Sequence, residues 1–540
     1  MKILLIYTLD YVQSNEKPIR KFEWIYFGIS IISAVLKQNG YQTDLLVMTR
    51  ETPFQKLTET IKDFKPDIIG FTSVASEFEY ICSIGEFVKE HFPDIYRVIG
   101  GVHVSIFPKE EYLNIFDAIC IGEGEYPILE LVQTLEKQVI PSGIKNLWLK
   151  IPDKSLPEGW RIEKNPTRNF IEDLDSLPYM DREIWQKFIP DEAFKENQRP
   201  SVVIGRGCPF NCNYCCNHAL KKISGGKYAR YRSPRNIIGE IETLEKYYPM
   251  QNAQKACQNC KSIEGGGAEV YLEVESFGAD IEWSLKLCEA LEQYNKTREN
   301  KLTFKINFRI NPASYKDLDK LFSAMKRAGF TGINVGLESG SERVRKEALN
   351  RHYSNEDVLK CVQAGKKYNI NVVFQVMLGL PTETIKDFNM TIDLIKDNNL
   401  EYFDPSIFYP YPGTNSFDYC QKHRLLKSHI NTRNERVRSV IDFPYFSKAQ
   451  IQKAWLWFRY YTNNKPLTFD EAFVLILNSY FTCYNKKWEK KFIPLFFALD
   501  AFLPSRNIRD NKGDFIFSLR FLFECFRRYM LRLIKIFHLS

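Results

Sequence analysis

Three cysteines fall within eight residues in the stretch Cys208-Pro209-Phe210-Asn211-Cys212-Asn213-Tyr214-Cys215. An apolar run precedes this stretch and predicts a strand, so the cysteines are expected on the loop at the end of that strand. Thiolates gathered this densely are soft ligands, which select an iron-sulfur cluster or zinc. Three cysteine ligands would leave one iron of a 4Fe-4S cluster open to another molecule.

Zinc is the alternative occupant of the cysteine loop. Cys216 and His218 are candidates for the fourth ligand that structural zinc needs. The pair Cys257 and Cys260 would also complete a zinc site, although an incidental loop is the simpler interpretation of a lone pair. Structural zinc usually pairs its cysteines as two CxxC units. The CxxxCxxC spacing, with an aromatic residue before the last cysteine, instead resembles the radical S-adenosylmethionine (SAM) family.

Apolar runs and helical patterns alternate on both sides of the cysteine loop between residues 199 and 430. The expected strands are 202–205, 269–275, 305–309, 332–336, 372–379 and 402–409. Six strands with intervening helices predict a partial (β/α)6 TIM-like barrel. The chemistry of such a barrel is found at the carboxyl ends of its strands.

Residues 1–145 show the same alternation and predict an α/β domain with a doubly wound, flavodoxin-like parallel sheet. Ligands bind such sheets beyond the carboxyl ends of the strands. A tight strand-to-helix turn is the alternative explanation of the Gly-Gly pair found there. The candidate binding residues at these ends are Ser73, Gly100, Gly101, His103, Gly122, Glu123, Gly124 and Glu125.

The remaining segments lack this alternation. Residues 146–198 are rich in proline and charge, which indicates a linker. Residues 431–540 predict an α-helical C-terminal region. Within it, residues 515–537 place apolar side chains on one helical face and basic side chains on the other. Such a helix either lies on an anionic membrane surface or packs on the barrel.

The composition limits the class of protein. The 540-residue chain is 44% hydrophobic and 26% charged, which excludes a disordered chain. Its net charge of +8 comes from interleaved basic and acidic residues, so no nucleic-acid partner is expected. The chain does not open on a signal segment. We therefore expect a cytoplasmic protein, associated with membranes only where the C-terminal helix is interfacial.

The resemblance to the radical SAM family extends from residue 199 to about 425. Gly336-Leu337-Glu338-Ser339-Gly340-Ser341 resembles a strand end found in many members, and the turn at 379–384 resembles their GLPGET turn. The usual Gly-Gly-Glu or Asp-Asp sequence is absent at Glu275, and a surface ion pair is the alternative role of Arg309. The resemblance implies a 4Fe-4S cluster on Cys208, Cys212 and Cys215. It also implies SAM binding by Tyr214, Glu275, Arg309, Glu338 and Ser339.

Placed before such a core, the N-terminal domain resembles the cobalamin-binding domain of the class B radical SAM methylases and their cyclase relatives. The resemblance implies that the eight strand-end residues accept the nucleotide tail of cobalamin. No DxHxxG motif occurs in the chain, so no histidine is expected as the lower cobalt ligand. His103 is expected to hydrogen-bond to the tail.

These resemblances imply a methyltransferase that acts on an unactivated carbon or phosphorus centre through a 5′-deoxyadenosyl radical and methylcobalamin. A small-molecule or lipid-like substrate and an external electron donor of the flavodoxin or ferredoxin type are implied as well. The same parts serve oxidative cyclisation or rearrangement, which is the enzymatic alternative. A non-catalytic cobalamin sensor is the alternative of another class, and the complete cysteine triad argues against it. The sequence identifies neither the substrate nor the residues that act on it.

Overall fold

The computed structural model describes residues 1–9, 17–19, 22, 25–194, 199–248, 268–426, 435–436 and 438–462. These residues belong to one compact unit, composed of Met1–Cys257 and Ile263–Pro466. The second unit, Gln258–Ser262 with Leu467–Ser540, lies outside the described residues. The cysteine pair at 257 and 260 and the helix expected at 515–537 also lie outside the described residues.

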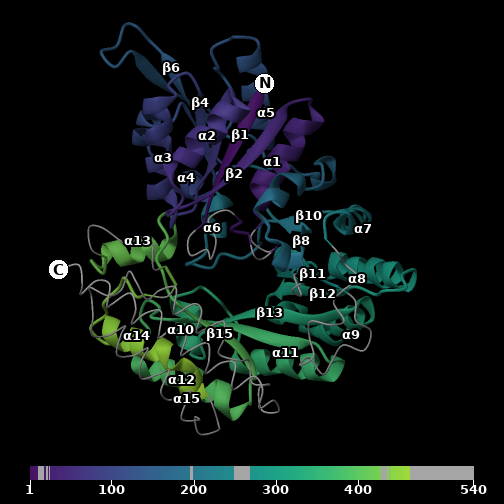
Figure 1. The fold of residues 1–540 in the computed structure, drawn as a ribbon. Coiled ribbons are helices and arrows are strands. Elements are labelled where there is room, and N and C mark those ends of the chain that lie inside the picture. Colours follow the sequence, from purple (N-terminus) through teal and green to yellow (C-terminus); the bar gives the residue numbers. More distant parts are fainter. Residues whose placement is uncertain are drawn as a thin grey trace, which may run out of the picture. The chain divides into compact units, whose positions relative to one another are not determined.

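The N-terminal sheet begins with five parallel strands in the order β2-β1-β3-β4-β5. This is the flavodoxin order, and the predicted fold class of the domain is confirmed (Figure 1). The strands are β1 (Lys2–Leu9), β2 (Gln42–Thr49), β3 (Ile68–Thr72), β4 (Tyr96–Gly100) and β5 (Ala118–Cys120). The connecting helices are α1 (Phe27–Gln38), α2 (Phe54–Phe64), α3 (Phe78–His91) and α4 (Val102–Ile106), and α5 (Glu125–Glu136) follows β5.

The segment 146–198, which the sequence indicates as a linker, contributes two strands to this sheet. Strands β6 (Leu147–Pro152) and β7 (Trp160–Lys164) continue the sheet beyond β5 in antiparallel pairing. Alternate residues of β6 are buried, but the alternation covers only six residues and ends at a proline. The pattern is too short to stand out from a proline-rich background. After β7, Trp185 Nε1 donates a hydrogen bond to Ser30 Oγ on α1 (2.8 Å), which fixes the segment to the sheet's helical layer.

The second sheet has six parallel strands in the order β15-β14-β13-β12-β11-β8. The predicted partial barrel is confirmed. Its strands are β8 (Ser201–Val203), β11 (Glu269–Phe277), β12 (Thr303–Phe308), β13 (Phe330–Glu338), β14 (Asn371–Leu378) and β15 (Tyr402–Ile407). Its helices include α7 (Pro234–Thr243), α8 (Ile281–Lys296), α9 (Leu318–Ala328), α11 (Asn355–Tyr368) and α12 (Ile385–Asp397).

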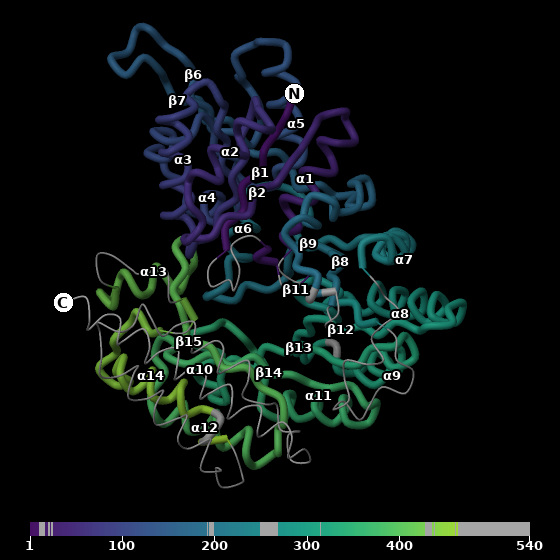
Figure 2. The backbone as a smooth tube through the Cα atoms, viewed as in Figure 1, coloured from purple at the N-terminus to yellow at the C-terminus, as the bar shows by residue number. Residues whose placement is uncertain are grey.

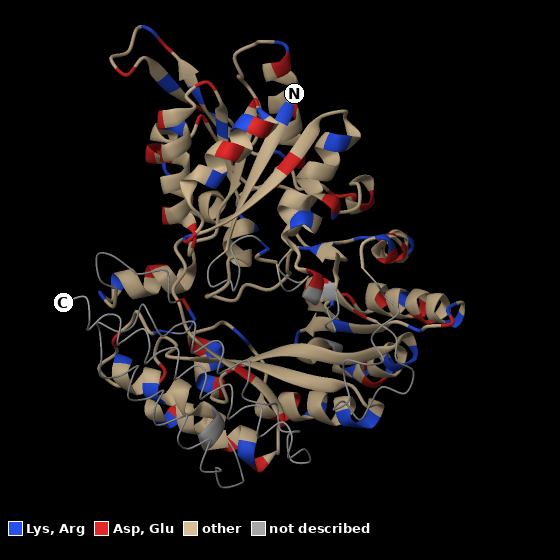
Figure 3. Cartoon of the chain, viewed as in Figure 1, with Lys and Arg blue, Asp and Glu red and all other residues tan. Residues whose placement is uncertain are grey.

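One face of this sheet packs against the helices. Phe308 on β12 meets Phe322 on α9 with the ring centroids 5.7 Å apart, and both side chains are buried. Helices α8, α9 and α11 follow one another along this face in the backbone trace (Figure 2). Charged residues lie mainly on the helices, whereas the strands consist mostly of other residue types (Figure 3). Within the part of the chain that the structure describes, no helix has the length and apolar character needed to cross a membrane.

Candidate functional site

The cysteine loop lies directly after β8 and is closed at its base by a short strand pair. Strand β9 (Gly205–Arg206) leads into the loop, and β10 (Arg230–Tyr231) returns to pair with β9 in antiparallel fashion. Between them, α6 (Asn217–Leu220) follows the last cysteine. Gly207 has φ +80°, and an added Cβ would lie 2.3 Å from the carbonyl oxygen of Tyr228. Only glycine fits this position, which sets the direction in which the chain enters the loop.

Each cysteine sulfur lies within hydrogen-bonding distance of a polar side chain. The pairs are Cys208 with Ser276 (3.6 Å), Cys212 with Arg309 Nη1 (2.9 Å) and Cys215 with Asn217 Nδ2 (3.4 Å). Burial raises the pKa of the Cys208 thiol. A hydrogen bond with the Cys216 side chain is the main cause that lowers the pKa of Cys215 to about 6. The N–H donors at Cys212 and Cys215 stabilise the negative charge of thiolate ligands, and the Ser276 hydroxyl, which accepts from the Cys208 thiol, can donate to a thiolate once that proton is lost.

The zinc alternative is weakened by the contacts of His218. The backbone N–H of Asn415 donates to His218 Nε2 (3.1 Å), so Nδ1 carries the proton and donates to the Cys212 carbonyl oxygen (3.1 Å). Both ring nitrogens are therefore used, and neither can bind a metal. The three-cysteine set fits a cluster that takes its fourth ligand from another molecule.

Tyr214 and Glu338, both predicted as SAM-binding residues, are in direct contact. The Tyr214 hydroxyl donates to Glu338 Oε1 (2.8 Å), and Glu338 is buried. Glu338 ends β13 with φ +63°, a left-handed conformation that costs about 1–2 kcal/mol for a residue with a Cβ. Such strain is retained where the surrounding contacts determine the side chain's position. The neighbouring Ser339 is fully buried, and its carbonyl oxygen accepts from Arg345 Nη1 (2.5 Å).

Arg351 completes this group and was not identified from the sequence. Its Nη1 donates to Glu338 Oε1 (2.7 Å) and to the Tyr214 hydroxyl (2.8 Å), while Nη2 donates to the Gly336 carbonyl oxygen (2.9 Å). Arg351 is buried, so its charge is balanced mainly by Glu338. No local motif identifies this arginine, because helix α10 (Glu342–Glu347) separates it from Glu338 in the sequence.

Two further predicted SAM-binding residues lie beside the cysteines. Arg309 contacts the sulfur of Cys212, and its guanidinium lies 3.8 Å from the centre of the Phe210 ring. This position excludes a surface ion pair. Glu275 remains exposed, although nearby protein atoms displace enough water to raise the pKa of its carboxyl. The negative charge of Cys215 raises that pKa further.

The Gly-Gly pair of the N-terminal sheet is explained by close backbone packing. Gly101 has φ +98°, and an added Cβ would lie 2.6 Å from the backbone nitrogen of Ser73 and 2.7 Å from its carbonyl oxygen. Ser73 Oγ donates to the Gly100 carbonyl oxygen (2.9 Å). The ends of β3 and β4 are thus held together by their own backbones. The Gly-Gly pair thus forms the tight turn that was given as the alternative explanation of the sequence. The turn does not prevent the same backbone groups from binding a ligand.

Glu123 and Glu125, two of the candidate cobalamin-binding residues, are paired with arginines. Arg206 donates to Glu123 Oε1 (3.0 Å) and Glu125 Oε1 (2.5 Å), and Arg230 donates to Glu123 Oε1 (2.9 Å). The arginines lower the pKa of Glu123 despite its partial burial. Since Arg206 and Arg230 belong to the strand pair under the cysteine loop, these carboxylates join the end of β5 to the cysteine loop.

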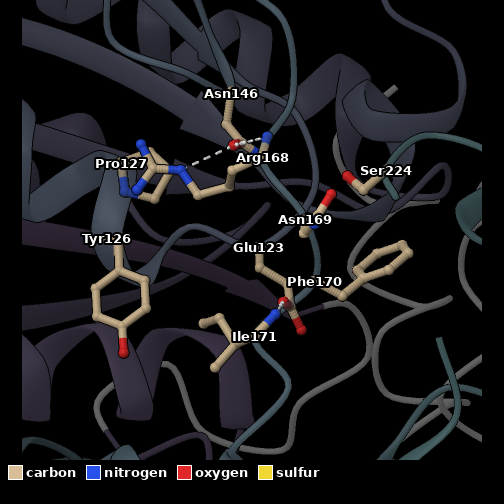
Figure 4. A pocket seen from close by; sticks show the side chains of 9 residues that line it. All are labelled: Glu123, Tyr126, Pro127, Asn146, Arg168, Asn169, Phe170, Ile171 and Ser224. Atoms are coloured by element: carbon tan, nitrogen blue, oxygen red, sulfur yellow. Dashed lines mark hydrogen bonds between the residues drawn. The ribbon is translucent and has the colours of Figure 1, made fainter. Parts of the chain in front are cut away.

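A narrow space adjoins Glu123 (Figure 4). The space is too narrow to admit a water molecule. Asn146 Oδ1 accepts from Arg168 Nε (3.1 Å) at one end of this space. The lining residues are Glu123, Tyr126, Pro127, Asn146, Arg168, Asn169, Phe170, Ile171 and Ser224. This space is packing between segments and does not form a ligand pocket.

His103 is buried on α4 among aromatic side chains. Its ring centroid lies 4.3 Å from that of Phe78 and 6.0 Å from that of Phe107. Burial lowers the pKa of His103 to about 4, and Lys109 lowers it further. Within the described residues, His103 Nδ1 is buried without a hydrogen-bond partner. The histidine is therefore neutral and retains one polar atom for another molecule.

Comparisons with known proteins identify both domains. The B12 binding domain family matches residues 20–132, and the Radical SAM superfamily matches residues 263–395. The protein joins a B12-binding domain to a radical SAM domain. The predicted family, and the coarser prediction of a cobalamin-dependent radical SAM enzyme, are confirmed. The cysteine loop lies before the matched part of the radical SAM domain.

Curated relatives of this chain have more than one activity in their names. An uncharacterized methyltransferase of Pyrococcus horikoshii is 24% identical over 84% of this chain and 90% of its own length. The anaerobic magnesium-protoporphyrin IX monomethyl ester cyclase of Rubrivivax gelatinosus is 24% identical over 73% of this chain and 66% of its own length.

Two solved structures share the fold. The radical SAM methyltransferase TsrM from Kitasatospora setae, with cobalamin and a 4Fe-4S cluster bound, has a TM-score of 0.57 at 16% identity. The match covers 79% of each chain. The cobalamin-dependent SAM radical enzyme OxsB, with aqua-cobalamin and SAM bound, has a TM-score of 0.63 at 15% identity. That match covers 99% of this chain and 80% of OxsB.

Proposed function

We propose that the protein is a cobalamin-dependent radical SAM methyltransferase that acts on an unactivated carbon or phosphorus centre. The observation that carries this proposal is the contact of the predicted SAM residues with the cysteine loop, in a chain that also contains a B12-binding domain. Methyltransferase is also the activity in the names of the Pyrococcus horikoshii relative and of TsrM.

Cys208, Cys212 and Cys215 would hold a 4Fe-4S cluster, and the N–H donors at Cys212 and Cys215 would stabilise its negative charge. A 4Fe-4S cluster with an open iron supplies an electron to the sulfonium of SAM, and cobalamin supplies a carrier for the methyl group. The electron itself would come from an external donor of the flavodoxin or ferredoxin type.

Tyr214, Glu338 and Arg351 would position SAM beside the cluster. Glu338 Oε1 is occupied by Tyr214 and Arg351, which leaves Oε2 to accept a hydrogen bond from the amino group or ribose of SAM. Arg309 carries a positive charge suited to the SAM carboxylate. The carboxylate of Glu275 is suited to the positively charged amino group of SAM. Ser339 would shape the ribose end of the site.

The N-terminal strand ends would accept the nucleotide tail of cobalamin through backbone groups at Ser73, Gly100, Gly101, Gly122 and Gly124. His103 supports this assignment through its buried, partnerless nitrogen. Glu123 and Glu125 would act through Arg206, by holding the end of β5 against the base of the cysteine loop.

A label experiment without substrate tests the proposal. The anaerobically reconstituted protein, loaded with cobalamin, is reduced and given SAM with a deuterated methyl group. A methyltransferase should form S-adenosylhomocysteine and place the label on the extracted corrinoid. Absence of the label from the corrinoid, together with formation of 5′-deoxyadenosine, would contradict methyl transfer.

Oxidative cyclisation is the second candidate function, favoured by the similarity to the Rubrivivax gelatinosus cyclase. It needs the same cluster and SAM residues but no transfer of the SAM methyl group. The label experiment therefore separates the two candidates, because a cyclase should form 5′-deoxyadenosine without S-adenosylhomocysteine.

A further inference from the structure

The face of the six-stranded sheet opposite the helices carries polar side chains. Along β12, Phe304, Ile306 and Phe308 are buried toward the helices. The alternate residues Lys305 and Asn307 are half-buried on the other face. The interior of a closed TIM barrel is normally filled by branched apolar side chains. A polar, partly exposed inner face is therefore suited to contact water or a ligand.

Three amide side chains from neighbouring strands share this inner face. Asn307 on β12 is the register partner of Asn334 on β13, and residues paired across parallel strands share a face. Gln375 on β14 is paired with Gly336, which lies two residues after Asn334 on the same face. A Cβ added at Gly336 would lie 2.2 Å from Glu338 Oε1 and 3.0 Å from Arg351 Nη1, so the buried Glu338–Arg351 pair covers Gly336 and borders the amides. All three amides are half-buried.

A tyrosine hydroxyl fixes what the two asparagines can offer. Tyr271 donates to Asn307 Oδ1 (2.6 Å) and accepts from Asn334 Nδ2 (2.7 Å). In this arrangement both N–H groups of Asn307 remain, together with one N–H group and the C=O group of Asn334. Within the described residues, none of these groups and no group of the Gln375 amide has a hydrogen-bond partner.

This surface lies within reach of the cysteine loop. Asn307 is two residues before Arg309 on the same face, or about 7 Å along the strand, and Arg309 contacts Cys212. Asn334 is on the strand that ends at Glu338. A molecule held by the amides would thus lie next to the region proposed for SAM.

We propose that Asn307, Asn334 and Gln375 form the substrate-recognition surface, and that the substrate is a polar molecule with a hydrogen-bond donor next to an acceptor. A lactam, a carboxamide or the edge of a nucleobase has this pattern. The inference rests on the proposed function, since it assigns the substrate class of the same site. It favours a polar molecule over the lipid-like alternative, because a lipid would leave these amides without partners at a cost for each group.

Saturation-transfer NMR on the cobalamin- and cluster-loaded protein, with saturating SAM, tests this assignment. The probes are 2-pyrrolidinone, a lactam with an N–H next to a C=O, and N-methyl-2-pyrrolidinone, in which the donor is blocked. We expect transfer to 2-pyrrolidinone and about fivefold less to its N-methyl derivative, as the loss of one hydrogen bond implies. Equal transfer to both lactams would overturn the proposal.

Variants connect the signal to the amides. Asn307→Leu with Asn334→Leu should reduce transfer to 2-pyrrolidinone about fivefold, whereas Asn371→Leu, an exposed amide at the amino end of β14, should leave it unchanged. Gln375→Leu breaks no hydrogen bond within the described residues, so it should fold and still reduce the signal. A wild-type signal in Gln375→Leu and in the double variant would contradict the proposal.

Two controls keep this inference separate from the proposed function. Farnesol serves as a lipid-like probe, and transfer to it that exceeds the lactam signal and survives the double variant would overturn the polar substrate class. SAM cleavage to 5′-deoxyadenosine is measured in the same samples without substrate. Its absence from the wild type would count against the proposed function, whereas its presence with equal lactam signals would count only against the amide surface.

Discussion

The carboxyl ends of the two parallel sheets are built in different ways. At the N-terminal sheet, apart from His103, several candidate residues already contact other parts of the protein: Gly101 packs on the backbone of Ser73, and Glu123 pairs with Arg206 and Arg230. At the six-stranded sheet, the candidate side chains converge on the cysteine loop. The first sheet therefore offers backbone groups and shape to a ligand, whereas the second offers side chains.

The comparison predicts the largest effect at the cysteines. Replacing Cys208, Cys212 and Cys215 with Ala should abolish the cluster, because thiolates are its only anchors in the protein. Iron content and formation of 5′-deoxyadenosine should fall to background after anaerobic reconstitution. Cys216→Ala is the matched control and should retain both. Cluster assembly in the triple variant would refute the assignment of the ligands.

A smaller but still large effect is expected at the buried ion pair of Arg351 and Glu338. Arg351→Met leaves the buried Glu338 carboxylate without its main counter-charge, which should cost about 3–5 kcal/mol of unfolding free energy. Adding Glu338→Gln should restore part of this stability, because the uncompensated charge is removed. Both variants should bind SAM more weakly than the wild type, measured by equilibrium dialysis. Wild-type SAM affinity in Arg351→Met would show that this arginine does not position the site.

Both sheets could be predicted from the sequence because their strands are strongly apolar runs. The six barrel strands begin within two residues of their expected positions, since buried parallel strands leave little ambiguity in such runs. Strands β6 and β7 were missed because short antiparallel edge strands in a proline-rich segment carry little signal.

The site was predictable only in part, for a related physical reason. Cys212 and Glu338 lie in motifs of adjacent residues, so a local pattern reveals them. Arg351 and the amide surface depend on how separate strands are aligned. Asn307 meets Asn334 only through the register of β12 with β13, and no local pattern encodes that register. The arginine partners of Glu123 were hidden for the same reason.

Two glycine substitutions test whether the N-terminal sheet binds its ligand through backbone groups. Gly101→Ala combines a left-handed φ of +98° with a clash at Ser73, whereas Gly40→Ala has a similar φ of +84° and no atom within 4 Å. The control should lose about 1 kcal/mol of unfolding free energy from strain alone. Gly101→Ala should lose about 1–3 kcal/mol more from overpacking. It should also retain less cobalamin, measured by absorption after desalting, while equal losses in the two variants would contradict close packing at β3 and β4.

The smallest expected effect concerns His103, whose folded-state pKa of about 4 lies below the ordinary value of 6.5. Because the unfolded chain takes up a proton first as the pH falls, His103 supports folding above pH 6.5 and loses that contribution toward pH 4. Between pH 7.5 and 5 this histidine should cost about 2 kcal/mol. Urea unfolding of the wild type and His103→Leu at both pH values isolates that amount, since other acid-sensitive groups are common to both proteins. If both proteins lose the same stability, the histidine is not held neutral.

The absorption spectrum of bound cobalamin should be alike in the wild type and His103→Leu, because His103 is expected to contact the nucleotide tail and not the cobalt. A spectral change in His103→Leu would identify His103 as a cobalt ligand.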